Sequence, residues 1–241
     1  MKRIFHCEAK GNENGIIQFI SLLLFLLPIY RAQNTLECTE MIRNNKCSCY
    51  TFEDAVYLDC QDTTIKNIKN ALKRVTNVYS FSIYDLDASE QALGPHFIPQ
   101  GACIKYIHIS RTNIGDIDDE TFMPLRKCLE TLSIVSSKIK FIPQKALSGM
   151  LKLMSLELVS NYIEEIPSYS FYGLPLKKIN IRGNIIRRVS ETAFTTLEST
   201  LLEIDLSENN LTTFPIISLA NLKRLQTLKL AWNEIYAIEN L

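Results

Sequence analysis

Four cysteines lie close together near the start of the chain, and their thiols could bind a metal, exchange electrons or form disulfides. Three of them, Cys47, Cys49 and Cys60, belong to the segment CSCYTFEDAVYLDC, and Cys38 precedes it. Structural zinc sites typically draw their ligands from two short Cys pairs, whereas this stretch contains one Cys-x-Cys and no second Cys-x-x-Cys. The choice between metal and disulfide depends on the compartment in which the chain folds.

The N-terminus has the features of a secretory signal. Basic residues precede an uncharged run, IIQFISLLLFLLPI at 16–29, which is shorter than the roughly 20 residues of a membrane span and suits a signal h-region. We expect residues 1–32 to be a signal peptide and the protein to be secreted and extracellular; an uncleaved signal anchor would translocate the remainder equally. Cleavage removes Cys7 and leaves an even number of cysteines, which predicts disulfides: Cys38, Cys47, Cys49, Cys60, Cys103 and Cys128.

Other reactive residues do not form a catalytic pattern. The histidines His6, His96 and His108 have no accompanying motif, and the sequence has no Gly-rich phosphate loop or G-x-S-x-G. We expect no catalytic residue, no metal and no cofactor. The 26 basic and 26 acidic residues cancel, which argues against nucleic acid or an anionic membrane surface as the partner.

A repeat of about 24 residues organises the chain. Units with the pattern LxxLxLxxNxL begin at 153, 176, 201 and 225, units with Thr112 and Ser137 in the Asn place begin at 104 and 129, and a degenerate copy begins at 78. The pattern and period are those of leucine-rich repeats. One coil cannot offset its own ordering entropy, so the coils must stack.

The expected fold is an α/β solenoid, a right-handed leucine-rich repeat horseshoe. Each LxL is a short strand of a parallel concave sheet, and each following IPxxAFxGL half is an irregular or short helical return on the convex side. We expect a cysteine-rich N-terminal cap over 33–65 and about seven repeats over 66–241, the last of them incomplete.

Two sets of residues have predicted structural roles. Cys103 and Cys128 occupy equivalent positions in consecutive repeats, about 4.8 Å apart in stacked strands, and are therefore expected to form a disulfide. An asparagine where the chain leaves each strand can donate to and accept from unpaired backbone groups. The expected asparagine ladder consists of Asn161, Asn184, Asn209 and Asn233.

The segment before the repeats resembles the N-terminal cap of extracellular leucine-rich repeat proteins. The resemblance lies in Cys47-Ser-Cys49 and Val56-Tyr-Leu58-Asp-Cys60. The resemblance implies the pairs Cys38–Cys49 and Cys47–Cys60. Within that superfamily, the long cap and the segment FSIYDLDASEQALGPHF are similar to secreted arthropod proteins, namely the non-catalytic subunit of shrimp luciferase and chaoptin. The resemblance covers residues 38–241 and implies no active site.

The exposed positions of the predicted concave strands indicate the function. They mix charges of both signs with small residues. Seven strands about 4.8 Å apart form an arc of roughly 30 Å, which matches one side of a standard protein interface. We expect a protein partner on the concave face, with these candidate contact residues: Tyr106, His108, Glu157, Lys178, Arg182, Asp205, Lys229 and Trp232. Asn210-Leu-Thr212 is the single N-x-S/T sequon and predicts a glycan at Asn210.

The chain stops within its last repeat, without a C-terminal cap, and we expect it to be a fragment. A membrane attachment is expected only if a missing C-terminal segment provides it. The main hypothesis is a secreted, non-catalytic protein-binding module. The alternatives are a non-catalytic partner subunit of a secreted enzyme complex and the N-terminal part of a cell-surface adhesion or innate-immune receptor.

Overall fold

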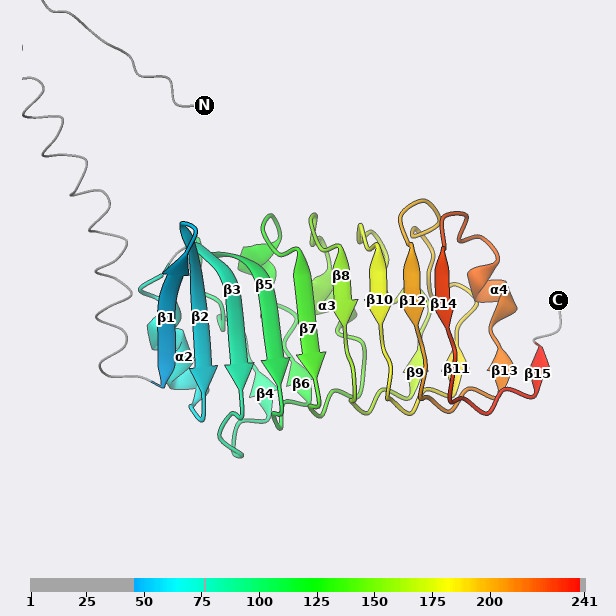
Figure 1. Cartoon of the computed structure of the whole chain (residues 1–241), viewed down its shortest axis with the longest axis horizontal. Coiled ribbons are helices and arrows are strands. Elements are labelled where there is room, and N and C mark those ends of the chain that lie inside the picture. The colour runs from blue at the N-terminus through cyan, green and yellow to red at the C-terminus, as the bar shows by residue number, and fades with distance from the viewer. Residues whose placement is uncertain (1–45, 76, 239–241) are drawn as a thin grey trace, which may run out of the picture.

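A computed structural model of the chain describes residues 46–75 and 77–238. The predicted signal peptide and Cys38 lie outside the described residues. Stacked coils form an elongated solenoid in which the strands of one large sheet run side by side (Figure 1). The α/β solenoid expected from the repeat is confirmed. No helix in the described part is long and apolar enough to cross a membrane.

The large sheet has nine strands, two from the segment predicted as the cap and seven from the predicted repeats. Eight of the nine strands run parallel, and the first pairs antiparallel with the second. In order across the sheet, the strands are β1 (Cys47–Phe52), β2 (Ala55–Gln61), β3 (Asn77–Tyr84), β5 (Cys103–Ser110), β7 (Thr131–Val135), β8 (Ser155–Glu157), β10 (Lys178–Asn180), β12 (Glu203–Asp205) and β14 (Thr227–Lys229).

The opposite side of the coils, here called the return side, carries short elements. Its strands form three small parallel pairs: β4 (Ala92–Leu93) with β6 (Asp116–Ile117), β9 (Glu165–Ile166) with β11 (Arg188–Val189), and β13 (Thr213–Phe214) with β15 (Ala237–Ile238). The helical segments are α2 (Ile65–Leu72), η1 (Met123–Leu125), α3 (Gln144–Leu147) and α4 (Ile216–Leu219).

Disulfides tie the first coils together. Cys47 on β1 is bonded to Cys60 on β2, and Cys103 on β5 is bonded to Cys128 in the next coil. Cys49 is also disulfide-bonded. The β1–β2 hairpin continues directly into the large sheet, so the cap and the repeats share one sheet and one core.

The core is a column of apolar side chains enclosed between the two sides. Leu156 and Leu158, the two leucines of the strand pattern in one coil, are completely buried. On the return side, Phe171 and Phe194 stack with ring centroids 5.8 Å apart. Each fully buried side chain of this size contributes about 1.5–3 kcal/mol relative to exposure.

Asparagine side chains hold the end of each strand to the preceding coil. Asn184 is buried; its Nδ2 donates to the carbonyls of Leu158 (2.8 Å) and Ile181 (3.1 Å), and its Oδ1 accepts from the Ile163 amide (3.0 Å). The same pattern of donation and acceptance recurs at Asn161, Asn209 and Asn233.

The N-terminal coils satisfy this position differently. Thr112 and Ser137 are hydrogen-bonded to each other through their hydroxyls at 2.9 Å. Leu86 occupies the same place in the first repeat and is buried among apolar side chains. These coils instead have the longer strands, since β3 and β5 have eight residues each whereas β8 has three.

A left-handed backbone recurs two residues after the second inward leucine or isoleucine of each strand. Its φ is +52° at Arg111, +53° at Ser160 and +70° at Gly183, the one glycine among the equivalent positions. A left-handed conformation costs an ordinary residue about 1–2 kcal/mol. It turns the amide toward the next coil, so that Ser160 donates to Arg182 and Gly183 to Ser207. Adjacent coils are thereby bonded at this turn as well.

Replacing Asn184 by alanine should lower the free energy of unfolding by about 2–4 kcal/mol, because a buried amide and buried carbonyls lose their partner. Asn113→Ala is the control, since Asn113 is exposed and makes one side-chain bond, to the Ala88 carbonyl; it should cost less than about 1 kcal/mol. Urea unfolding measures both. Equal losses in the two variants would contradict the structural role assigned to the buried asparagine.

Candidate binding surface

Side chains that point away from the core along the nine-stranded sheet form one continuous surface, here called the sheet face. Alternate residues of a strand point to opposite sides. On β5, Ile107 and Ile109 are therefore buried, while Tyr106 and His108 are on the sheet face. Strand register then places Tyr106 beside Thr131 and His108 beside Ser133.

Four tyrosines form a row across the first strands of the sheet face. The tyrosine row consists of Tyr50 on β1, Tyr57 on β2, Tyr79 on β3 and Tyr106 on β5, with successive ring centroids 5.1, 5.5 and 4.9 Å apart. Tyr50 remains 48% exposed and Tyr79 38% exposed. A hydrogen bond with Tyr79 raises the pKa of Tyr106 to about 12, so its hydroxyl is a stable donor at neutral pH.

Two basic side chains of the first coils, Arg111 and Lys105, are already engaged. Arg111 donates to both carboxylate oxygens of Asp85 at 2.8 Å and lies over the Tyr84 ring, 5.5 Å from its centroid. Lys105 pairs with Glu130 at 3.6 Å and lies 5.8 Å from the Tyr79 centroid. Both cations therefore combine a carboxylate with an aromatic ring.

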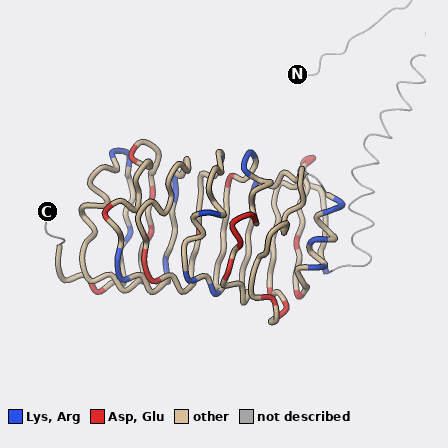
Figure 2. Tube along the Cα trace, turned by 180° about the vertical axis from the view of Figure 1, so that it is seen from behind, with Lys and Arg blue, Asp and Glu red and all other residues tan. Residues whose placement is uncertain are grey.

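The C-terminal half of the sheet face consists of charges paired between adjacent strands. Lys178 pairs with Glu157 at 3.3 Å, and Lys229 pairs with Glu203 at 3.0 Å. Arg182 pairs with Glu208 in the turn after β12. From behind, Figure 2 shows basic and acidic residues interspersed along the solenoid. Exposed pairs contribute at most about 1 kcal/mol each, so their main effect is to neutralise the surface locally.

Asp205, predicted as a contact residue, is only 7% exposed. Its carboxylate accepts from the Ser207 amide at 3.0 Å and lies 3.7 Å from Lys229 Nζ. It holds the strand end and orients Lys229, and it offers little surface to a partner. Trp232, by contrast, is 82% exposed in the turn after β14.

A chain of polar contacts crosses the middle of the sheet face. His108 Nδ1 lies 3.1 Å from Ser133 Oγ, which donates to Glu157 Oε2 at 3.2 Å. A hydrolytic triad requires the histidine between the acid and the serine, whereas here the serine lies between the other two. Burial lowers the pKa of His108, so the neutral imidazole is favoured.

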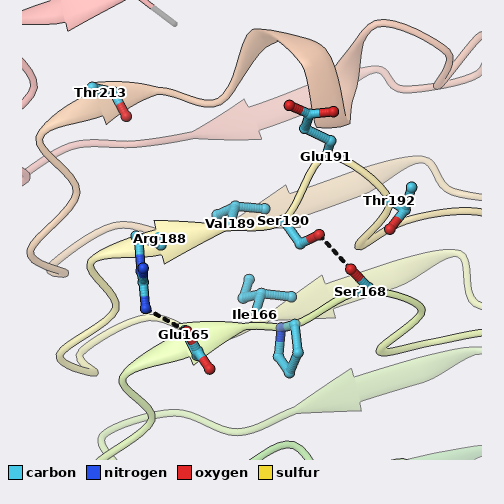
Figure 3. Close-up of a pocket in the computed structure, with 10 residues that line it drawn as sticks. Glu165, Ile166, Ser168, Arg188, Val189, Ser190, Glu191, Thr192 and Thr213 are labelled. Atoms are coloured by element: carbon cyan, nitrogen blue, oxygen red, sulfur yellow. Dashed lines mark hydrogen bonds and ion pairs between the residues drawn. The ribbon is translucent and has the colours of Figure 1, made fainter.

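A hollow of about 770 Å³ lies on the return side, along β9 and β11 (Figure 3). On its wall, the hydroxyls of Ser168 and Ser190 are hydrogen-bonded to each other at 2.7 Å, and Arg188 pairs with Glu165 at 3.1 Å. Its described lining contains no histidine that could activate a hydroxyl. Across residues 46–75 and 77–238, no group of three or more His, Cys, Asp or Glu side chains could hold a metal ion.

The match to a known protein family lies in the repeat region. The leucine rich repeat family model matches residues 127–176 and 175–235, which include every strand from β7 to β14. Residues 127–235 therefore consist of leucine-rich repeats. The solved TLR13–ssRNA13 complex has the same fold, with a TM-score of 0.54 at 18% identity over 73% of this chain and 32% of that one.

Two curated relatives share this leucine-rich repeat region. Tsukushi of Rattus norvegicus is 30% identical over 169 residues, covering 67% of this chain and 47% of that protein. Leucine-rich repeat-containing G-protein coupled receptor 5 of Rattus norvegicus is 32% identical over 121 residues, covering 41% and 13%. The chain spans about half the length of Tsukushi and a smaller part of the receptor.

Sequence reasoning placed Tyr106 and His108 on the sheet face but missed Tyr50, Tyr57, Tyr79 and Tyr84. Their strands belong to the cap and the degenerate first repeat, which the LxxLxLxxNxL pattern aligns poorly. A signal was nevertheless present, because Val56-Tyr57-Leu58 and Val78-Tyr79 both place a tyrosine beside an inward apolar residue.

The burial of His108 predicts that acid weakens the fold. Its pKa is lowered in the folded state, so the unfolded chain binds the proton more tightly and stability falls as the pH drops through the ordinary pKa of 6.5. Urea unfolding at about pH 7.5 and pH 5 should show a smaller loss in His108→Gln than in the wild type. The same loss in both proteins would show that His108 does not contribute.

Proposed function

We propose that the protein is an extracellular, non-catalytic module that binds another protein through the sheet face, which we take to be the concave side of the solenoid. The carrying observation is the composition of that face. It combines an exposed tyrosine row at one end with Arg182 and Trp232 toward the other, and Tyr, Arg and Trp are the residues that dominate binding energy in protein interfaces.

The size of the face supports a macromolecular partner. Nine strands about 4.8 Å apart span roughly 38 Å. A face of that length has room for one side of a standard interface, which buries about 800 Å² per partner. The hollow on the return side is a weaker candidate, because its polar groups are exposed and already paired with each other.

Nucleic acid is a less suitable partner. Binding to phosphates requires cations that are available to release counterions, and the cations of the sheet face are paired with carboxylates. The TLR13 complex with ssRNA13 therefore supports the fold of this chain and not its ligand.

A receptor ectodomain is the second candidate. The similarity to leucine-rich repeat-containing G-protein coupled receptor 5 favours it. A transcript that continues beyond Leu241 into a hydrophobic stretch of about 20 residues would establish a membrane-anchored form. The arthropod resemblance, and with it the role of a partner subunit in an enzyme complex, stays a prediction, since the relatives reported above are Tsukushi and a receptor.

We also propose N-glycosylation at Asn210. The residue is exposed and directly follows the buried Asn209, so a glycan would project from the edge of the sheet face. Treatment of the secreted protein with a glycosidase should lower its intact mass, and the Asn210→Gln variant should show no such change. An unchanged mass of the secreted wild type would reject the site.

Affinity capture from the native tissue tests the binding surface. The variant Tyr106→Ser/Arg182→Ser/Trp232→Ser should recover at least about tenfold less partner than the wild type, because such anchors each contribute about 2 kcal/mol or more. The control replaces exposed apolar residues outside the large sheet: Phe141→Ser, Leu151→Ser and Tyr172→Ser. Equal recovery by the sheet-face variant, or loss only in the control, would refute the proposal.

A further inference from the structure

The N-terminal end of the sheet face differs in charge from the rest of the chain. Residues 46–62 contain one basic residue, Lys46, and four acidic ones, Glu53, Asp54, Asp59 and Asp62, a net charge of −3, whereas the whole chain has a net charge of zero. This excess of carboxylates coincides with β1 and β2, which carry the first two rings of the tyrosine row.

Asp59 lies among the aromatic side chains. It is two residues from Tyr57 on the same strand, so both side chains lie on the sheet face. Register places it beside Ser48 on β1 and Ser82 on β3, two small neighbours, and Ser82 in turn lies beside His108. Tyr57, Tyr79 and Tyr106 flank this line of small residues on one side, and Tyr84 follows on the other.

The protein's own cations show what this surface accepts. Arg111 and Lys105 each lie over a tyrosine ring while pairing with a carboxylate, at Tyr84 with Asp85 and at Tyr79 with Glu130. Asp59 also combines a carboxylate with a ring, because it interacts with the hydroxyl of Tyr50, the first ring of the tyrosine row. Among the described residues no basic side chain forms an ion pair with Asp59.

We propose that Asp59 and the tyrosine row form a subsite for arginine side chains on an extended, basic segment of the protein partner. Arginine suits it better than lysine, because its planar guanidinium stacks on rings, pairs with a carboxylate through two bonds and is weakly hydrated. The row spans three strand spacings, about 14 Å, which equals about four residues of extended chain. The two arginines of an extended Arg-x-Arg segment lie about 7 Å apart and therefore fit within that length. This inference rests on the proposed function and specifies the partner's chemistry.

The test uses a defined probe, the fluorescein-labelled peptide Gly-Arg-Gly-Arg-Gly, and fluorescence anisotropy with the complete secreted chain. It should bind more tightly than the Lys analogue, and the Glu analogue should not bind. Asp59→Asn and Tyr79→Ser should each weaken binding by about tenfold. Glu203→Gln, which removes a carboxylate at the other end of the same face, should leave the affinity unchanged.

Several results would overturn the subsite. These are no binding of the arginine peptide at millimolar concentration, equal binding of the Glu analogue, or unchanged affinity in both Asp59→Asn and Tyr79→Ser. Asp59→Asn is the more conservative variant and guards against a folding defect, which circular dichroism would reveal. If the native partner is captured equally by wild type and by these two variants, the partner does not use the subsite, and this inference fails while the proposed function stands.

The opposite result separates the two ideas as well. If the sheet-face variant Tyr106→Ser/Arg182→Ser/Trp232→Ser captures as much native partner as the wild type, the proposed function fails. In that case, arginine-selective peptide binding that Asp59→Asn weakens would show that the subsite exists without serving that partner.

Discussion

Each coil of this protein depends on its neighbours for both burial and hydrogen bonding. Ordering about 24 backbone residues costs roughly 1–2 kcal/mol each, more than the apolar residues of one coil can recover. Asn184 illustrates the dependence, because it bonds to carbonyls in its own coil and the preceding one and to the Ile163 amide between them. The left-handed turn at Ser160 sends its amide to the next coil. Stacking is therefore the condition for any coil to exist.

This constraint frees the sheet face for function. Core leucines and the asparagine ladder carry the stability, so side chains such as Tyr79 and Trp232 point outward without structural obligation. The two ends use this freedom differently. One presents aromatic rings with an excess of carboxylates, and the other presents lysine and arginine side chains that adjacent strands neutralise. A partner meets a rigid surface whose chemistry changes along its length.

The repeat pattern predicted the solenoid because its information is local. The spacing of Leu153, Leu156, Leu158 and Asn161 places each residue within its own coil, and stacking follows. The tyrosine row was not predictable in this way. Two of its rings come from the antiparallel β1–β2 hairpin, one from the irregular first repeat and one from the next repeat, so no single period aligns them. Asp205 was misjudged for a related reason, since its position in the pattern is outward while its environment is buried.

Native-state hydrogen exchange tests the dependence between coils most directly. The amides of Leu158, Ile181 and Leu206 each donate to the following coil, to Asn180, Asp205 and Lys229. If adjacent coils stabilise one another, these three amides should open with one shared free energy, equal within about 0.5 kcal/mol. Three separate opening free energies, differing by more than about 1 kcal/mol, would show that the coils open independently and would contradict this account.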